Sequence, residues 1–220
     1  MLITNFFSEI NLGLYCKSSD KFFLIGEDFS KYINLIEKEL KVRGFPLKLY
    51  NSNFIGLFSS FNSNGIILSK LCYKNEVEKI KKELGINVYV SKSKYTAIGN
   101  LIVANDKGCL ISKKIEKKEI KEIENVLGVE VVRATIARLD LVGSICVATN
   151  NFCLLHRDAK ENEIELVKDV LKVDVGIATI NTGSPYIGYG MVANSNGFVV
   201  SEKTTPVEIN RIFEIVGKNI

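Results

Sequence analysis

The protein has 220 residues, of which 46% are hydrophobic and 25% are charged. This balance is typical of a folded chain, excludes intrinsic disorder, and suits one large domain or two small ones. The net charge is only +4, which allows a nucleic-acid partner but does not require one. The single histidine excludes a metal centre built from several histidines.

The start of the chain and its longest uncharged segment do not have the pattern of a targeting or membrane-spanning element. The first seven residues lack a basic region, and Glu9 interrupts the only apolar stretch there. Residues 175–201 carry no charge, but Asn181, Pro185 and Asn194 indicate strands and turns. Five cysteines without a secretory signal are typical of a reducing compartment. We therefore expect a soluble, cytoplasmic protein without a membrane partner.

Five predicted amphipathic helices recur along the chain at a nearly constant period. Each contains apolar residues at positions i, i+3 and i+7, which lie on one face of a helix. The triplets begin at Ile33, Val77, Ile120, Ile164 and Ile209, and therefore advance by 44, 43, 44 and 45 residues. Lysine and glutamate are common between them, which predicts helices with one buried and one solvated face.

Glycines form a second series with the same period, at Gly13, Gly56, Gly99, Gly143 and Gly188. Glycine is favoured where the chain bends tightly or where a second backbone comes so close that a Cβ atom would clash. Each glycine precedes a short run of strand-forming residues. We expect these strands at residues 14–16, 57–59, 101–103, 145–147 and 191–193.

A polar turn and a further strand follow each of these runs. Asn64-Gly65 and Asn196-Gly197 each separate two apolar runs, which is a strong signal for a β-hairpin. The second hairpin strands are predicted at residues 22–24, 66–68, 109–111, 152–155 and 198–200. Another strand precedes the glycine of each unit, most clearly at residues 88–90, 131–135 and 175–179.

The three series agree on one period and predict five ββαβ-type units. A helix in each unit excludes a four-stranded propeller blade, and the strands exclude an all-helical solenoid. The terminal units are as apolar as the middle ones, so we predict that the array closes on itself. The predicted fold is a single α/β domain, a fivefold ring with strands around the axis and helices outside. Its repeats are approximately residues 1–43, 44–86, 87–129, 130–173 and 174–220.

Several short segments resemble one known family. They are residues 97–100 (AIGN), 141–147 (LVGSICV), 170–173 (VLKV), 181–184 (NTGS) and 190–194 (GMVAN). In this order and at this spacing they resemble the translation initiation factor 6 family of archaea and eukaryotes, over essentially the whole chain. The resemblance implies that family's pentein-type, fivefold pseudosymmetric β/α propeller. Eukaryotic members continue into a polar tail, whereas this chain ends at Ile220, so we expect the archaeal type.

The resemblance also implies a function. Family members bind the large ribosomal subunit near the sarcin–ricin loop, at a ribosomal protein and adjacent rRNA, and prevent premature association with the small subunit. It therefore implies a monomeric factor for large-subunit biogenesis and translation initiation, with no cofactor, no DNA partner and no chemistry of its own. By the same resemblance, Asn100 is expected on the ribosome-facing surface.

The first alternative is a pentein-fold enzyme that acts on guanidino, arginine-like substrates through a cysteine nucleophile. Cys109 and Cys153 share a repeat position that is apolar in other units, which indicates the core, and Cys16 and Cys146 are interpreted in the same way. His156 is the only histidine available as a base, and Cys153 with His156 cannot complete a zinc site. We therefore favour a non-enzymatic protein, although a nucleophile from another unit stays open.

The second alternative is a general RNA-binding module, based on the lysine-rich residues 113–121. Glu116, Glu119, Glu122 and Glu124 interleave with these lysines at spacings that allow surface ion pairs. We therefore expect a solvated helix face there rather than an RNA groove.

The predicted binding surface consists of the five loops between the first strand of each repeat and its glycine. Repeat symmetry places these loops on one face of the ring. Their mixture of basic, amide and apolar side chains suits a protein contact with some phosphate contacts. The predicted contact residues are Asn11, Leu12, Asn53, Phe54, Lys92, Lys94, Tyr95, Asn100, Arg138, Leu139, Asn181, Thr182 and Ser184. The alternative that these are ordinary exposed turns stays open.

Overall fold

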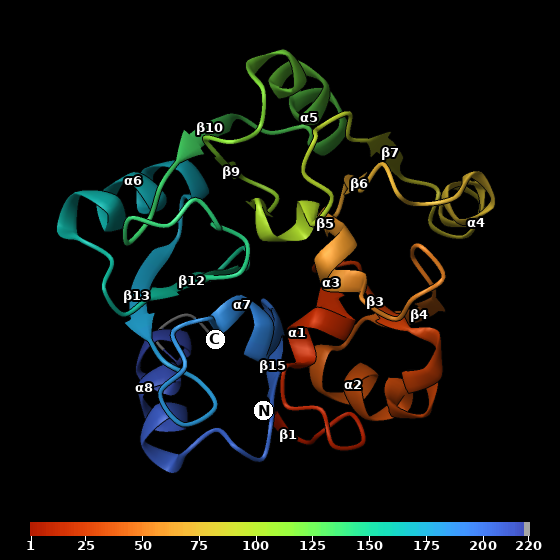
Figure 1. Ribbon diagram of the computed structural model, residues 1–220. Helices are drawn as coiled ribbons and strands as arrows, with labels where there is room; N and C mark the ends of the chain where they lie inside the picture. The colour runs from red at the N-terminus through yellow and green to blue at the C-terminus, as the bar shows by residue number, and fades with distance from the viewer. Residues whose placement is uncertain (218–220) are drawn as a thin grey trace.

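Five three-stranded sheets surround a central axis in the computed structural model, which describes residues 1–217 (Figure 1). The predicted amphipathic helices are present and lie outside the sheets, with their apolar faces turned inward. They are α2 (Ile33–Leu40), α4 (Lys74–Leu84), α5 (Ile120–Leu127), α6 (Glu161–Leu171) and α8 (Pro206–Val216). Within residues 1–217, none of the helices combines the length and the apolar composition that a membrane crossing requires.

Each sheet has an inner, a middle and an outer strand. In the first sheet, β2 (Cys16–Ser18) pairs antiparallel with β3 (Phe22–Gly26), and β3 pairs in parallel with β4 (Arg43–Leu47) after the crossover through α2. The next three sheets have the same order. Their strands are β5 (Ser59–Phe61), β6 (Gly65–Leu68) and β7 (Asn87–Val90); β8 (Ile102–Ala104), β9 (Cys109–Ser112) and β10 (Val131–Ala134); and β11 (Cys146–Ala148), β12 (Phe152–His156) and β13 (Asp174–Ala178).

The fifth sheet closes the ring with both ends of the chain. Its inner strand β14 (Met191–Asn194) and middle strand β15 (Gly197–Val200) form a hairpin, and β1 (Leu2–Ile3) supplies the outer strand in parallel, with Leu2 opposite Val199. The predicted closure is therefore confirmed. The outer strand of each of the other sheets is the first strand of the next sequence repeat, so the sheets extend across the predicted repeat boundaries.

The five predicted glycines form a second closed ring, around the axis. A Cβ atom on Gly13 would lie 2.1 Å from the carbonyl oxygen of Gly188. Built on each of the other four, it would lie 1.8–2.3 Å from the carbonyl oxygen of the preceding glycine in the series. The expected close approach of two backbones is therefore confirmed at all five positions.

The strands expected after the first two glycines begin two residues later than predicted and the next two begin one residue later, whereas β14 begins at Met191 as predicted. Gly13 lies inside the short helix α1 (Leu12–Tyr15) and Gly56 inside α3 (Ile55–Phe58), so β2 and β5 begin only at Cys16 and Ser59. The 3-10 helix η2 (Ile98–Asn100) and helix α7 (Ile187–Gly190) occupy the same place in later units. The helical turn brings each glycine against its neighbour at the axis before the chain extends into the strand.

The cores of the sheets bury four of the five cysteines. Cys16, Cys109, Cys146 and Cys153 are at most 2% exposed, as predicted, and Cys72 is half-buried. All five are free thiols.

Candidate functional site

The loops after the outer strands all emerge on one side of the ring. Middle and outer strands run parallel, so both end on the same face, and the hairpin turns between inner and middle strands lie at the other end. We call this side the loop face; it consists of residues 4–11, 48–54, 91–97, 135–141 and 179–186. In Figure 1, the short helices α1, α3 and α7 surround the axis between these loops.

Four of the five loops contain a tight turn with residues in the left-handed region. Tyr50 has a φ of 53°, Ala137 of 51°, Arg138 of 62° and Thr182 of 65°, and Phe7 in the first loop has a φ of 56°. Such values cost a residue other than glycine roughly 1–3 kcal/mol and persist only where the surroundings impose them. The shape of the loop face is therefore held by specific contacts.

These contacts come from carboxylates in the first turns of the outer helices. The Glu76 carboxylate accepts hydrogen bonds from the backbone N–H groups of Tyr50 (2.9 Å) and Asn51 (3.0 Å), and Glu163 accepts one from Ala137 (3.1 Å). Each carboxylate also accepts the N–H of its own helix N-cap residue, so one side chain fixes both the loop and the helix start.

The remaining units repeat this arrangement. Glu208 accepts the backbone N–H groups of Thr182 (3.1 Å) and Gly183 (2.7 Å), and Glu119 accepts that of Lys92 (2.9 Å) and the Ser91 hydroxyl (2.6 Å). In the first unit, the Phe7 N–H donates to the Tyr32 hydroxyl at 2.6 Å. The series Tyr32, Glu76, Glu119, Glu163, Glu208 has the repeat period and was missed by the prediction, although its spacing is visible in the sequence.

Glu119 corrects one expectation about the lysine-rich segment. The ion pairs Lys118–Glu116 (2.7 Å) and Lys121–Glu124 (3.6 Å) lie on the surface, as expected. Glu119, however, is only 1% exposed and is turned inward toward the third loop, because its role is to accept loop donors rather than to pair with lysine.

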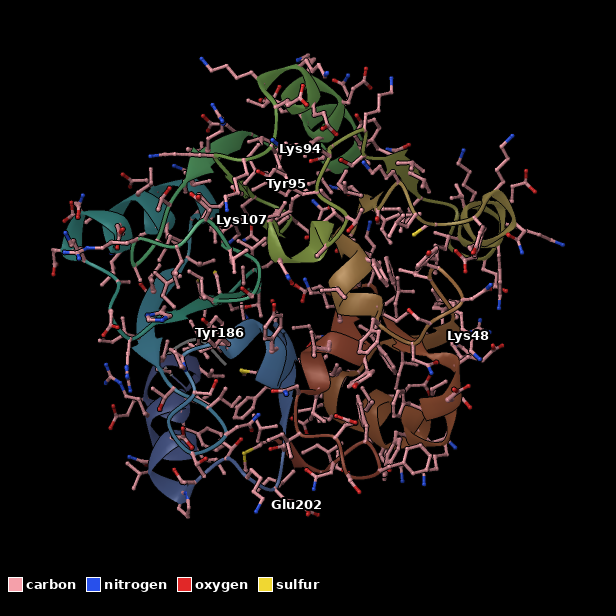
Figure 2. All side chains as sticks on the ribbon, viewed as in Figure 1. Lys48, Lys94, Tyr95, Lys107, Tyr186 and Glu202 are labelled. Carbon is pink, nitrogen blue, oxygen red and sulfur yellow. The ribbon has the colours of Figure 1, made fainter. Side chains whose placement is uncertain are left out.

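A basic patch surrounds Tyr95 on the third and fourth loops and on the segment after β9, where Lys114 forms an ion pair with Asp140 at 3.8 Å. The Nζ atoms of Lys94 and Lys114 lie 5.2 and 5.8 Å from the centre of the Tyr95 ring, and Figure 2 shows Lys94 beside it. Lys92 and Arg138 are exposed on the same face. Within residues 1–217, Lys92, Lys94 and Arg138 form no ion pair, so their charges are available to an anionic partner.

An aromatic patch lies on the first and second loops. Phe7 is 57% exposed and Phe54 is 36% exposed. Tyr15 stacks on Phe54 with ring centres 5.1 Å apart, and Phe29 connects Tyr15 (4.8 Å) to Phe7 (5.7 Å). Of these rings, the prediction included only Phe54. Exposed aromatic side chains held in place by others are common at the centres of protein interfaces.

The structure removes two predicted contact residues from the surface. Leu12 is fully buried in the core of the first unit. Asn181 is 8% exposed: its Nδ2 donates to the Ile10 carbonyl (2.9 Å), and its Oδ1 accepts from the hydroxyls of Ser201 (2.6 Å) and Thr204 (3.0 Å). Both residues therefore support the loop face from beneath.

The other predicted residues of the first, second, fourth and fifth loops lie on the loop face with different degrees of exposure. Asn53 is half-buried and exchanges hydrogen bonds with Asp28, through its Nδ2 (2.7 Å) and its Oδ1 (3.2 Å). Leu139 is half-buried over the core of the fourth unit. Thr182 is exposed, and Asn11 and Ser184 are half-buried.

Asn100 lies in η2, close to the axis, and is half-buried. Its backbone carbonyl accepts the Gly143 N–H at 2.9 Å. The Oδ1 atom is buried and has no hydrogen-bond partner among residues 1–217.

The histidine that the enzyme alternative would use as a base is buried. His156 is 6% exposed, and its Nδ1 accepts the backbone N–H of Asp158 at 3.1 Å. Burial lowers the pKa of His156, so the ring is neutral near pH 7. Within the described residues, no group of three or more histidine, cysteine and acidic side chains is placed to hold a metal ion.

Comparison with known proteins identifies relatives over almost the whole chain. The profile of the eIF-6 family matches residues 1–215. A protein of Pyrococcus horikoshii is 44% identical over 94% of this chain and 93% of its own length, and one of Nitrosopumilus maritimus is 42% identical over 90% of each. One of Natronomonas pharaonis is 34% identical over 94% of each. All three archaeal proteins are named translation initiation factor 6.

Proposed function

This chain belongs to the eIF-6 family, and from that premise we propose that it binds the large ribosomal subunit through its loop face and thereby prevents the small subunit from joining. It acts as a monomer in the cytoplasm, in large-subunit biogenesis and in translation initiation. The observation that carries this proposal is the juxtaposition of an aromatic patch and a basic patch on one face whose loops are held rigidly.

The two patches suit two kinds of contact. The aromatic patch offers apolar area to a ribosomal protein, because aromatic side chains bury much surface and lose little conformational entropy on binding. Lys92, Lys94 and Arg138 form no ion pairs within residues 1–217 and suit contacts to rRNA phosphates. A protein that binds through both patches at once binds tightly only where a ribosomal protein and rRNA lie side by side.

Inhibition of joining then needs no chemistry. The hydrogen bonds from the loop backbones to Glu76, Glu163 and Glu208 preorganise the face, which reduces the entropy lost on binding. The sheets and outer helices remain above the bound face and occupy the space that the small subunit would need. Release consequently requires loss of the face contacts rather than turnover of a substrate.

Sedimentation with purified archaeal ribosomal subunits tests the proposal. We expect stoichiometric migration with the large subunit alone, and fewer joined particles when both subunits are mixed under joining conditions. Lys94→Glu should weaken binding about tenfold or more, since it reverses a charge at a phosphate contact. Asn100→Ser should weaken binding as well, with thermal unfolding of both variants nearly unchanged.

Lys21→Glu is the matched control. Lys21 is an exposed lysine in the hairpin turn before β3, at the opposite end of the ring, and its replacement makes the same change in net charge. Equal losses for Lys21→Glu and Lys94→Glu would contradict the assignment to the loop face. Failure of the unmodified protein to migrate with the large subunit at moderate salt would contradict the proposed function itself.

A further inference from the structure

Two thiols meet in the hairpin of the fourth sheet. The Sγ atoms of Cys146 on β11 and Cys153 on β12 are 3.2 Å apart. The register explains this contact: Ala148 is opposite Cys153, so Cys146 is its diagonal neighbour on the same side of the sheet. A disulfide has an S–S bond of about 2.05 Å, so the two sulfur atoms need to approach by only about 1 Å.

Repeat symmetry shows that this pair is particular to one unit. Cys16 occupies the position of Cys146 in the first sheet, and Cys109 occupies that of Cys153 in the third. The neighbours that would complete the pair there are Phe23 and Ile102. Cys16 and Cys109 are equally buried but have no second thiol at the paired position, so the chain contains its own matched controls.

Cys146 also faces a cavity on the axis of the ring. The cavity is lined by all five inner strands and has a volume of about 50 Å³, which is room for a few water-sized molecules. Lys17 on β2 lies in the same cavity, where its Nζ is 3.5 Å from the Gly99 carbonyl oxygen. Among residues 1–217, Lys17 is the one charged side chain in the lining.

The electrostatics of the cavity distinguish the two thiols. Burial lowers the pKa of the Lys17 ammonium to about 8, and a Cys146 thiolate opposes that shift, so the two charges stabilise each other. Burial, and then the neighbouring Cys146, raise the pKa of Cys153. Cys153 therefore remains a neutral thiol, and we assign the attacking role to Cys146, which lines the same cavity as the Lys17 ammonium.

We propose that Cys146 and Cys153 form a redox-active pair, which a small hydroperoxide in the axial cavity oxidises to an intramolecular disulfide. The Cys146 thiolate attacks one peroxide oxygen and the O–O bond breaks, giving a sulfenic acid at Cys146 and, with hydrogen peroxide, one water after proton uptake. The Cys153 sulfur then attacks the Cys146 sulfur, its proton leaves with the hydroxyl group as a second water, and the disulfide remains. Two thiols lose two electrons and two protons to one peroxide. This proposal goes beyond ribosome binding and does not depend on it.

Peptide mapping provides a direct test, because Arg138 and Arg157 enclose both thiols in a single tryptic peptide that contains no other cysteine. The folded protein is treated with hydrogen peroxide, quenched with catalase, alkylated in denaturant and digested without reductant. We expect the peptide of residues 139–157 to escape alkylation and to be lighter by two hydrogen atoms. Cys16, Cys72 and Cys109 should remain alkylated.

Variants separate the steps. In Cys153→Ser, the sulfenic acid at Cys146 should persist and be captured by dimedone, whereas Cys146→Ser should abolish oxidation. Lys17→Met should slow disulfide formation roughly tenfold, because it removes the positive charge that favours a thiolate in the cavity. Cys109→Ser is the control and should leave the rate unchanged. Thermal unfolding of each variant checks that the fold is retained.

Two results would overturn the proposal. One is full alkylation of the 139–157 peptide after peroxide treatment. The other is oxidation of Cys16 and Cys109 at the same rate as the pair, because oxidation would then pass through global unfolding. An unchanged rate in Lys17→Met would overturn the role given to the lysine.

Discussion

At the scale of single residues, Glu208 shows how one carboxylate connects a loop to a helix. Burial alone would raise its pKa, but hydrogen bonds from the backbone N–H groups of Thr205 and Gly183 and from the Thr205 and Thr179 hydroxyls outweigh burial and lower it below 4.5. Because the folded-state pKa is below the unfolded-state value, ionised Glu208 stabilises the fold above about pH 4.5. That contribution is lost as the pH falls through the folded-state pKa.

We therefore expect Glu208→Gln to lower the free energy of unfolding at pH 7 by about 1–2 kcal/mol, the value of hydrogen bonds to a charged group. The variant should also lose less stability than the unmodified protein between pH 7 and pH 3.5. Urea unfolding at both pH values measures this difference. Glu165→Gln, on the exposed face of α6, is the control and should follow the unmodified protein; identical pH profiles for all three proteins would refute the role of Glu208.

The same scale shows why two predicted contacts were wrong. Asn181 has the residue type of an exposed turn, but the partners that bury its amide, Ser201 and Thr204, follow it by 20 and 23 residues. Leu12 precedes its glycine by one position, and only the helical turn of α1 directs it inward. Such partners depend on tertiary placement, whereas the exposure of Lys94 and Arg138 follows from their charge alone.

At the scale of elements, the glycine ring limits how closely neighbouring units approach. In Gly99→Ala, the new Cβ would lie 2.0 Å from the Gly56 carbonyl oxygen and 2.6 Å from that of Ser59. Both atoms belong to backbone packed between sheets and cannot move aside. We expect a loss of about 3 kcal/mol or more in the free energy of unfolding, measured by urea denaturation.

Gly85→Ala is the control that distinguishes a steric clash at the new Cβ atom from the cost of a left-handed backbone conformation. Gly85 ends α4 with a φ of 63°, and no atom of residues 1–217 outside its immediate neighbours lies within 4 Å of the point where an alanine Cβ would stand. Only the cost of a left-handed alanine therefore applies, which is about 1 kcal/mol. If Gly99→Ala were no more destabilising than Gly85→Ala, the glycine ring would not determine the packing of the units.

Elements were predicted best where a period extends over a whole segment. The helices and hairpins follow from apolar spacing and from turns such as Asn196-Gly197. The pairing of the outer strands was harder to predict from the sequence, because β4 lies in the second sequence repeat but completes the first sheet. The spacing of Glu76 and its equivalents was visible, but their role needed the geometry of the loops.

At the scale of the whole molecule, ring closure makes the loop face a single surface. The N-terminal strand β1 completes the sheet of β15, and Gly13 lies against Gly188, so the first and fifth loops are neighbours in the same ring as the others. The distance and the orientation between the aromatic patch near the chain start and the basic patch near its middle are therefore fixed. We therefore expect the protein to select a partner by how well its apolar and anionic surfaces match the separation of the two patches, and not by charge alone.

This arrangement predicts the salt dependence of binding. If Lys92, Lys94, Lys114 and Arg138 each contact one rRNA phosphate, the logarithm of the affinity for the large subunit should fall with the logarithm of salt concentration with a slope of about −3. Arg138→Glu should make the slope shallower by about one. Lys21→Glu, at the opposite end of the ring, should leave it unchanged.

The same titration with unstructured RNA separates this mode from a general RNA-binding module. In the proposed binding mode, unstructured RNA occupies only the basic patch and leaves the aromatic patch without a protein contact. We therefore expect its affinity to be about a hundredfold or more below that of the large subunit. Fluorescence titration at several salt concentrations measures both affinities. Equal affinities for unstructured RNA and for the large subunit, together with a salt slope steeper than the value expected for four phosphate contacts, would contradict this mode. Charge alone would then drive binding, and Phe7 and Phe54 would not contribute.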